Sequence, residues 1–360
     1  MDNATIISAD NYYQGYEIIH PLLTANCTCA ILINVLFFYV IYRYSRTELG
    51  SYKYVMMTFA TFEIFYASSD LLVMPGMFCH DHYIAYFSTS FLRNKSYAWQ
   101  IFTCLYPAAY GQSISLLCVH FVYRYFSINR PNSMHWFKFP YALVWVLVFA
   151  LYSINYWVTI FYGWMPSQEK NKIIRNQMYE VFGVDVDDVQ VLSSVFFKIT
   201  PSALEPQWID LLALLNLCAM NGTVICIIFV LAWRIYMLIH SLEVAASKRS
   251  KRLHLMLFKA LVLQTCVPLV CGFLPVLIYY TCPLIGVNLG FYSNYVIVFL
   301  SFYPLFDALV VIWIITDYRR EILGLFGIHK YVGVRISDTP QAATSTNRRS
   351  NSDNHFQSKF

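Results

Sequence analysis

This chain of 360 residues is divided by long stretches that contain no Asp, Glu, Lys or Arg. Such stretches cover residues 18–42, 96–123, 139–168 and 211–233, and a longer one covers 260–306. A helix that crosses a bilayer needs about 20 predominantly apolar residues. Charged residues make up 12% of the chain, whereas an average soluble domain contains about a quarter. The sequence therefore predicts a membrane protein and excludes an ordinary soluble enzyme or a small secreted domain.

Six spans account for these stretches, and a seventh, at 54–78, is apolar apart from Glu63 and Asp70. Pro283, Gly286 and Gly290 mark a turn that divides the longest stretch into two helices. We predict an all-α membrane protein, a seven-transmembrane-helix bundle with spans at about 18–42, 54–78, 97–123, 139–163, 208–233, 257–280 and 291–316. A short amphipathic helix at 317–330 and a disordered cytoplasmic tail at 331–360 are expected to follow the seventh span.

The distribution of positive charge predicts the orientation of the bundle in the bilayer. With the N-terminus outside, most of the 25 Lys and Arg residues fall in cytoplasmic loops and in the tail, as the positive-inside rule requires. Residues 1–17 are then extracellular, and they contain no Lys or Arg. The sequons at Asn3 and Asn94 also fall outside and are candidate glycosylation sites.

Motifs for catalysis and for cofactors are absent from the sequence. There is no Walker loop, no HExxH and no GxSxG, so we expect neither enzyme activity nor a cofactor. The segment Cys79–His82 contains metal-binding residue types, but ordinary exposed loop residues are the favoured interpretation. No basic patch lies on a soluble domain, so nucleic acid is not an expected partner.

The predicted spans also limit the chemistry of a ligand. The third span has no acid to pair with an amine, and the last span has no Lys to form a retinal Schiff base. A charge in the membrane interior is costly and normally meets an opposite charge. These absences favour a small neutral ligand.

The ten cysteines give no disulfide framework. Most lie within predicted spans, where a free cysteine behaves as a small apolar residue. The long outer loop at 164–206 contains none. Pairing among Cys79, Cys104 and Cys282 stays open, because connectivity does not follow from sequence.

Three acids lie within predicted spans. Glu63 and Asp70 are seven residues apart on the second span and therefore share a helix face. Such acids can form an ion site, a proton-linked switch or an interhelical lock, or they can simply be hydrogen-bonded groups that hold the bundle together. Asp307 follows Pro304 on the seventh span, where a proline permits a kink, and this pair is a candidate hinge.

Aromatic and polar side chains gather in the outer halves of three spans. They are candidate ligand-binding residues, although an interfacial aromatic belt or a chance cluster would give the same pattern. The candidates are Phe102, Tyr106, Tyr110, Gln112, Tyr279, Tyr280, Tyr292 and Tyr295.

Several strings in the sequence resemble one known family. They are GSYKYV (50–55), FEIFYA (62–67), VHFVYRYF (119–126), LFKALVLQT (257–265), YPLFD (303–307) and IITDYRR (314–320). In their order and spacing they resemble the nematode serpentine chemoreceptors of the Str group, also called class R. The resemblance extends from about residue 50 to residue 320.

The resemblance implies a GPCR-like fold and a chemosensory function. Members of the family are G-protein-coupled receptors of chemosensory neurons, usually in the ciliary part of the plasma membrane. The resemblance places Tyr123, Arg124 and Tyr125 where rhodopsin-like receptors carry an Asp-Arg-Tyr switch, but the acid is missing here. Arg124 can also be an ordinary boundary arginine whose head reaches the interface. The family usually has a proline after the acid of span seven, where this chain has Ala308.

We therefore expect a receptor that detects an odorant-like small neutral molecule and signals to a heterotrimeric G protein. Movement of spans six and seven about Pro268, Pro275 and Pro304 would carry the signal. The basic third inner loop would contact the G protein or anionic lipid of the bilayer; it contains Lys248, Arg249, Lys251 and Arg252. The alternative class is a ligand-gated chemosensory ion channel of inverted topology, which the charge distribution disfavours.

Overall fold

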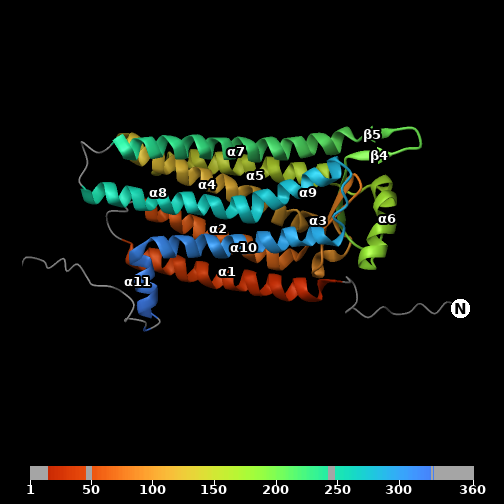
Figure 1. Cartoon of the computed structure of the whole chain (residues 1–360), viewed down its shortest axis with the longest axis horizontal. Coiled ribbons are helices and arrows are strands. Elements are labelled where there is room, and N and C mark those ends of the chain that lie inside the picture. Colours follow the sequence, from red (N-terminus) through yellow and green to blue (C-terminus); the bar gives the residue numbers. More distant parts are fainter. Residues whose placement is uncertain (1–14, 46–50, 242–247, 326, 328–360) are drawn as a thin grey trace, which may run out of the picture.

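The computed structural model describes residues 15–45, 51–241, 248–325 and 327. Among these residues, seven long helical segments run side by side along the longest axis of the molecule (Figure 1). They are α1 (Tyr16–Tyr44), α2 (Tyr52–Val73), α4 (Leu105–Asn129), α5 (Ala142–Gly163), α7 (Trp208–Ser241), the joined α8 (Lys248–Pro268), η5 (Leu269–Phe273) and α9 (Leu274–Leu284), and α10 (Asn294–Ile314). The predicted seven-helix bundle is confirmed.

The bundle exposes large apolar side chains on its outside and encloses a smaller set of polar side chains within a mainly apolar core. On α5, Val146 and Leu147 are about 60% exposed, and such side chains suit contact with lipid. Five segments are long and apolar enough to cross a membrane by length and composition: α1, α5, α7, α8–α9 and η6 (Phe291–Ser293) with α10. The helices α2 and α4 fall outside this group, because they carry many of the polar side chains of the interior.

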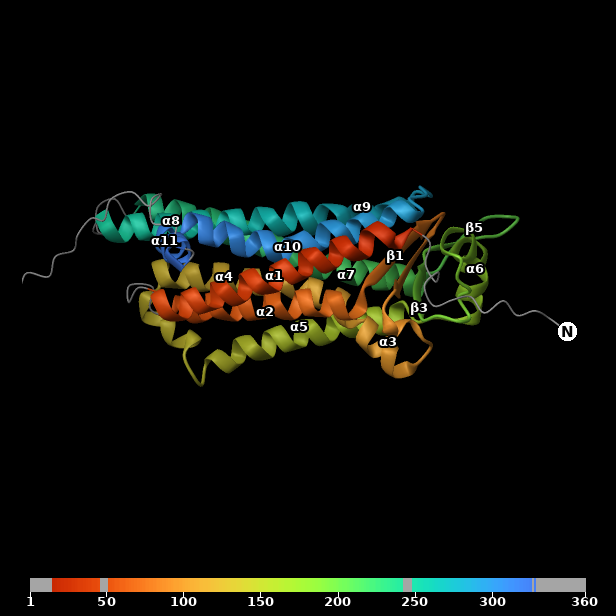
Figure 2. The same cartoon turned by 90° about the horizontal axis from the view of Figure 1, so that it is seen from below.

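Helices α4 and α10 each pack against several other helices of the bundle. Helix α1 lies along α2 and α10, α4 lies along α5 and α7, and α8 lies along α10. Figure 2 shows α5 at one edge of the bundle. The short η4 (Pro131–Phe137) connects α4 to α5. This packing brings residues of α2, α4, α8 and α10 together in the interior.

One end of the bundle, here named the cap end, carries a small sheet (Figures 1 and 2). Strands β1 (Pro75–His80), β2 (Tyr83–Ser88) and β3 (Val191–Val195) form it in that order, and all neighbours are antiparallel. Five further short elements surround it: η3 (Phe91–Arg93), α3 (Tyr97–Thr103), α6 (Gln168–Phe182), β4 (Phe197–Ile199) and β5 (Leu204–Pro206). The sequence analysis anticipated no strands.

The predicted second span, 54–78, extends too far at its C-terminal end. Helix α2 ends at Val73, because Met74 adopts a left-handed conformation with φ 42° and its N–H donates to the Asp70 carbonyl. Pro75 and Gly76 then begin β1. Strand β1 is almost entirely buried, and its mostly apolar residues directly follow the apolar residues of α2. In the sequence the two segments therefore resemble one continuous helical span.

The predicted third span, 97–123, is divided in two. Helix α3 ends at Thr103, and α4 begins at Leu105 and continues to Asn129. Pro107, which lies in the first turn of α4, was the available signal for a new helix start, and the sequence analysis did not use it.

The opposite end, here named the tail end, carries α11 (Thr316–Leu325), which runs across the end of the bundle (Figure 1). It coincides with most of the predicted amphipathic helix. Tyr318 anchors it: the side chain is buried, and its hydroxyl lies 2.8 Å from Ser45 Oγ. The tail at 331–360, Asn3 and the side chains of the basic inner loop lie outside the described residues.

Candidate ligand and signalling sites

A network of buried acids joins four helices in the interior. Glu63 on α2 is fully buried, and the Tyr303 hydroxyl of α10 donates to its Oε1 at 2.5 Å. Asp307, one turn further along α10, accepts from Gln264 Nε2 of α8 at 2.8 Å. The two acids lie close enough to interact electrostatically, and Ser113 of α4 hydrogen-bonds to Tyr303. The structure thus brings two of the three predicted intramembrane acids together.

Each of these acids keeps one oxygen without a partner. Oε2 of Glu63 and Oδ1 of Asp307 are buried and accept no hydrogen bond from any described residue. No described Lys, Arg or His forms an ion pair with either of them. Unsatisfied polar groups in a membrane interior are costly, so this network depends strongly on the hydrogen bonds that it does make.

The third acid, Asp70, belongs to a separate contact with α1. Cys27 Sγ lies 3.3 Å from Asp70 Oδ2, and Oδ1 has no partner among the described residues. Glu63 and Asp70 therefore both face the interior from one side of α2, as their spacing predicted, but they have different neighbours.

Two asparagines of α1 contribute polar contacts that the sequence analysis missed. Asn26 Nδ2 donates to Ser301 Oγ at 3.0 Å, and Asn34 Nδ2 donates to the Pro304 carbonyl at 2.9 Å. Asn34 thus holds α1 against the proline turn of α10. An asparagine within an apolar stretch was the available signal, because polar side chains between membrane helices normally face a partner helix.

Arg124 lies inside the bundle toward the tail end rather than at its lipid-facing boundary. The side chain is 4% exposed, and its Cζ sits 4.3 Å from the centroid of the Tyr52 ring of α2. Its Nη2 has no hydrogen-bond partner among the described residues. The alternative of an arginine that extends to the interface therefore does not describe this side chain.

The residues around Arg124 are aromatic or basic. Tyr123 packs against Tyr52 with 5.5 Å between ring centroids, and His120 lies 6.0 Å from the same ring. His254 of α8 lies close enough to Arg124 for the two side chains to interact electrostatically. The predicted neighbour Tyr125 is half-buried, and its hydroxyl accepts from Asn129. Sequence reasoning did not identify Tyr52 or His254, because contacts between helices depend on packing.

The eight candidate ligand-binding residues separate into two groups. Tyr106, Tyr110 and Tyr279 are buried in the interior, and Tyr280 and Gln112 are partly buried. Phe102, Tyr292 and Tyr295 are exposed, by 43%, 73% and 51%. Phe102 precedes the break at Cys104, and Ser293 and Asn294 take the interior positions between Tyr292 and Tyr295. We name Tyr106, Tyr110, Tyr279 and Tyr280 the phenol cluster.

The phenol cluster lies beneath the sheet, and the hydroxyl of Tyr110 is buried there without a partner among the described residues. Tyr279 donates to the Ala85 carbonyl of β2 at 3.0 Å, and the Tyr106 hydroxyl accepts from Tyr66 at 3.2 Å. The Tyr110 hydroxyl is buried and has no partner among the described residues. Its ring lies against Gly272 of η5, where a Cβ would stand 3.1 Å from Tyr110 Cε2. A hydroxyl in this state can donate to an uncharged acceptor.

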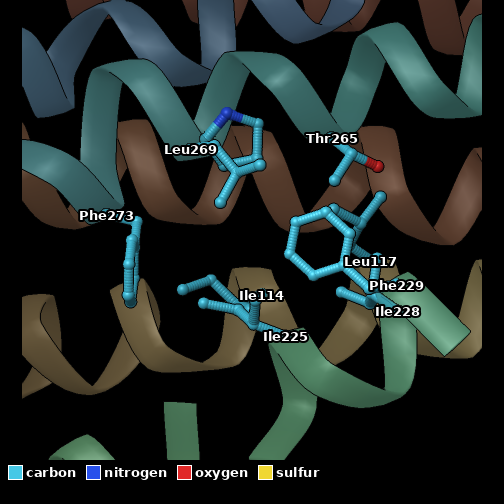
Figure 3. Close-up of a pocket in the computed structure, with 9 residues that line it drawn as sticks. Ile114, Leu117, Ile225, Ile228, Phe229, Thr265, Leu269 and Phe273 are labelled. Atoms are coloured by element: carbon cyan, nitrogen blue, oxygen red, sulfur yellow. The ribbon is translucent and has the colours of Figure 1, made fainter. Parts of the chain in front are cut away.

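A narrow apolar pocket lies one helical turn from Tyr110, toward the tail end (Figure 3). None of the eight candidates lines it. The lining residues come from α4, α7, α8 and η5: Ile114, Leu117, Ile225, Ile228, Phe229, Thr265, Pro268, Leu269 and Phe273.

The cap end contains the remaining candidates. Asn94 is exposed beside η3, so its sequon is accessible. The cysteines left open for pairing are free thiols, and Cys79 lies near Cys282. Burial raises the pKa of the Cys79 thiol to about 12. Among the described residues, no group of three or more metal-ligating side chains occurs, and His82 Nδ1 instead lies 2.8 Å from the Pro283 carbonyl.

A solved structure has a similar fold. The chain is similar to a crystal structure of squid rhodopsin, with a TM-score of 0.56, 11% sequence identity, and coverage of 89% of this chain and 87% of that chain. At this identity the likeness shows the fold alone.

Sequence comparisons identify the family. "Serpentine receptor class r-10" of Caenorhabditis elegans is 28% identical over 278 residues, which cover 76% of this chain and 81% of that protein. The protein of the same name from Caenorhabditis briggsae is 27% identical over 79% of this chain and 83% of its own length. "G-protein coupled receptor str-33" of C. elegans is 25% identical over 85% and 90%. The sequence model described as "Serpentine type 7TM GPCR chemoreceptor Str" matches residues 20–323, so the chain belongs to the Str family of serpentine G-protein-coupled chemoreceptors.

Proposed function

We propose that this chain is a chemosensory receptor of the plasma membrane that detects a small uncharged molecule and activates a heterotrimeric G protein. Membership of the Str family supports the receptor class. The N-terminus and the cap end are proposed to face outward, and the ciliary membrane of chemosensory neurons is the proposed location. The comparisons give the channel alternative no support.

The observation that carries the ligand proposal is the free hydroxyl of Tyr110. It is buried within the phenol cluster, and no described residue accepts its hydrogen bond. A neutral ligand with one hydrogen-bond acceptor would satisfy it without bringing a charge into the bundle. Asp70 lies close enough to Tyr106 for the two side chains to interact electrostatically, and an acid near the phenol cluster can pair with an amine. A test therefore has to distinguish neutral ligands from amines.

Arg124 supports the proposal of a G-protein contact. It is a buried positive charge with no acid partner among the described residues, and one of its nitrogens is unsatisfied. A partner that inserts an acceptor at the tail end would satisfy this nitrogen. The basic residues that precede His254 would extend the same surface.

The test uses cells that express the chain together with a G-protein reporter. Small neutral volatiles with an acceptor group are compared with matched amines and carboxylates. We expect responses to neutral compounds, lost on inhibition of the G protein. Tyr110→Phe should weaken potency by up to about 10-fold, the effect of one hydrogen bond, and Tyr295→Phe, a matched change on the exposed surface, should leave it unchanged.

Two results would contradict this proposal. A ligand-evoked current that persists when the G protein is inhibited would indicate the channel class. Responses confined to amines and abolished by Asp70→Asn would replace the uncharged ligand with a cationic one.

A further inference from the structure

Three polar side chains meet on the outer surface of the bundle, where α5 and α7 lie side by side (Figure 1). Nδ2 of Asn216 on α7 donates to Oδ1 of Asn155 on α5 at 2.9 Å and to Oγ1 of Thr159 at 2.7 Å. The Thr159 hydroxyl lies 2.8 Å from the Asn155 carbonyl oxygen and 3.2 Å from its Oδ1. Asn155 is exposed, and the other two are half-buried. We name these three residues the amide cluster.

The amide cluster lies at the depth of the lipid hydrocarbon. Trp208 begins α7 and is 68% exposed, and an exposed tryptophan at a helix end is typical of the membrane interface. Asn216 follows eight residues later, which is about 12 Å deeper at 1.5 Å per residue, within a hydrocarbon core about 30 Å thick. Leu151 and Leu212 precede Asn155 and Asn216 by one turn on the same helix faces, and they are 58% and 60% exposed. The cluster is therefore polar within a lipid-facing, apolar surface.

Two polar groups of the cluster have no partner among the described residues. The Nδ2 group of Asn155 donates no hydrogen bond, and Oδ1 of Asn216 accepts none. Lipid hydrocarbon offers neither a donor nor an acceptor, so an unsatisfied polar group there is costly. Polar side chains on membrane helices are normally paired with a side chain of a neighbouring helix. We therefore expect protein to cover this face of α5 and α7.

We infer that this face binds a second copy of the chain, in a symmetric dimer that the two asparagines hold together. A two-fold contact is reciprocal, so Asn155 of each copy can meet Asn216 of the other. Nδ2 of each Asn155 then donates to Oδ1 of the other copy's Asn216, and both unpartnered groups are satisfied in both chains. The two residues are already hydrogen-bonded within each chain, so four asparagine side chains would meet close to the symmetry axis.

Symmetry also favours a second copy over a different membrane protein. The donor of Asn155 and the acceptor of Asn216 lie at nearly the same depth, because the two side chains are bonded to each other. A copy related by a two-fold axis along the membrane normal presents the complementary groups at that same depth. An unrelated helix would have to carry both an acceptor and a donor at matching positions. The inference does not depend on the ligand or on the G protein.

The test measures energy transfer between donor-labelled and acceptor-labelled copies of the full chain in liposomes, with the labels on tags after Phe360. We expect transfer above the level of random proximity, and it should fall as lipid is added, as a reversible dimer requires. Asn155→Leu and Asn216→Leu should each weaken self-association by about 10-fold, the effect of losing two hydrogen bonds between membrane helices. Thr58→Val, a polar-to-apolar change on the exposed face of α2, should leave association unchanged.

A mixture of the two variants tests the reciprocal pairing. In a mixed dimer one Asn155 still meets one Asn216, and the two introduced leucines meet each other. The mixed pair should therefore associate more strongly than either variant associates with itself. A mixed pair that associates no more strongly would overturn the inference, because it would exclude this pairing. Transfer by the unaltered chain at the level of random proximity would also overturn it, and that measurement needs no substitution.

Discussion

The guanidinium of Arg124 lies over the ring of Tyr52, with 4.3 Å between Cζ and the ring centroid. The acid that would normally neutralise such a buried cation is replaced here by the face of an aromatic ring. A cation over an aromatic face is stabilised by about 0.5–2 kcal/mol, with larger values when water is excluded. The contact joins the tail-end portion of α4 to the first turn of α2.

Removal of the ring at position 52 is expected to free Arg124. Tyr52→Leu should raise basal G-protein signalling by about 3- to 10-fold, because a contact of about 1 kcal/mol no longer restrains the arginine. Tyr52→Phe keeps the ring and should keep basal signalling near its original value. Reporter activity without ligand, normalised to surface expression, measures both. Equal effects of the two variants would assign the role to the hydroxyl instead.

The hydrogen bond from Tyr303 to Glu63 should matter for stability. Tyr303→Phe leaves a buried carboxyl oxygen without its donor, which typically costs about 1–3 kcal/mol. We expect a lower thermal unfolding midpoint for the purified chain, and no change for Tyr295→Phe on the exposed surface.

A double variant separates this bond from general packing. Glu63→Met combined with Tyr303→Phe removes both polar partners, so its cost should be smaller than the sum of the two single costs. Additive costs would show that the two side chains act independently, contrary to the contact in the structure.

The seven helices could be predicted because the membrane imposes a simple rule. Each span needs a long, predominantly apolar stretch, and the gaps between charges marked most of the spans directly, although the second contains Glu63 and Asp70 and the seventh contains Asp307. The sheet could not be predicted in this way. Strand β1 is apolar and continues the apolar run of α2, and the helix ends through the backbone conformation of Met74.

The candidate site was predicted only in part, because contacts between helices depend on how the helices pack against each other. The spacing of Glu63 and Asp70 gave the correct common face, because it depends on one helix alone. The contact of Glu63 with Tyr303 joins residues 240 positions apart and depends on how α2 packs against α10. The same limit explains why Tyr52 was missed, and why Tyr292 and Tyr295 were placed among candidates that face the interior.

The Cys79 thiol should be unusually unreactive. Burial raises its pKa to about 12, whereas an ordinary cysteine thiol titrates near 8.5. At pH 8 the reactive thiolate is then rarer than in a free peptide by a factor of more than about 1,000. Iodoacetamide alkylation of the folded chain, mapped by mass spectrometry, should spare Cys79 at pH 8, and its rate should rise as the pH approaches 12. Rapid alkylation at pH 8 would show that the thiol is accessible and ionised.

The orientation of the cap end gives a prediction that bears on the whole proposal. Asn94 is exposed beside η3 at the cap end, so it should carry a glycan if this end faces outward. A glycosidase should shift the mobility of the chain made in animal cells. In a background where Asn3 is replaced by Gln, Asn94→Gln should abolish that shift.

A tag placed after Phe360 tests the opposite end of the same chain. It should bind antibody only after the cells are permeabilised, since the positive charges of the loops and tail favour the cytoplasm. Staining of intact cells, together with no glycan on Asn94, would reverse the orientation. The surface around Arg124 would then face outward and could not meet a G protein, so the signalling proposal would fail even though the family and the fold would stand.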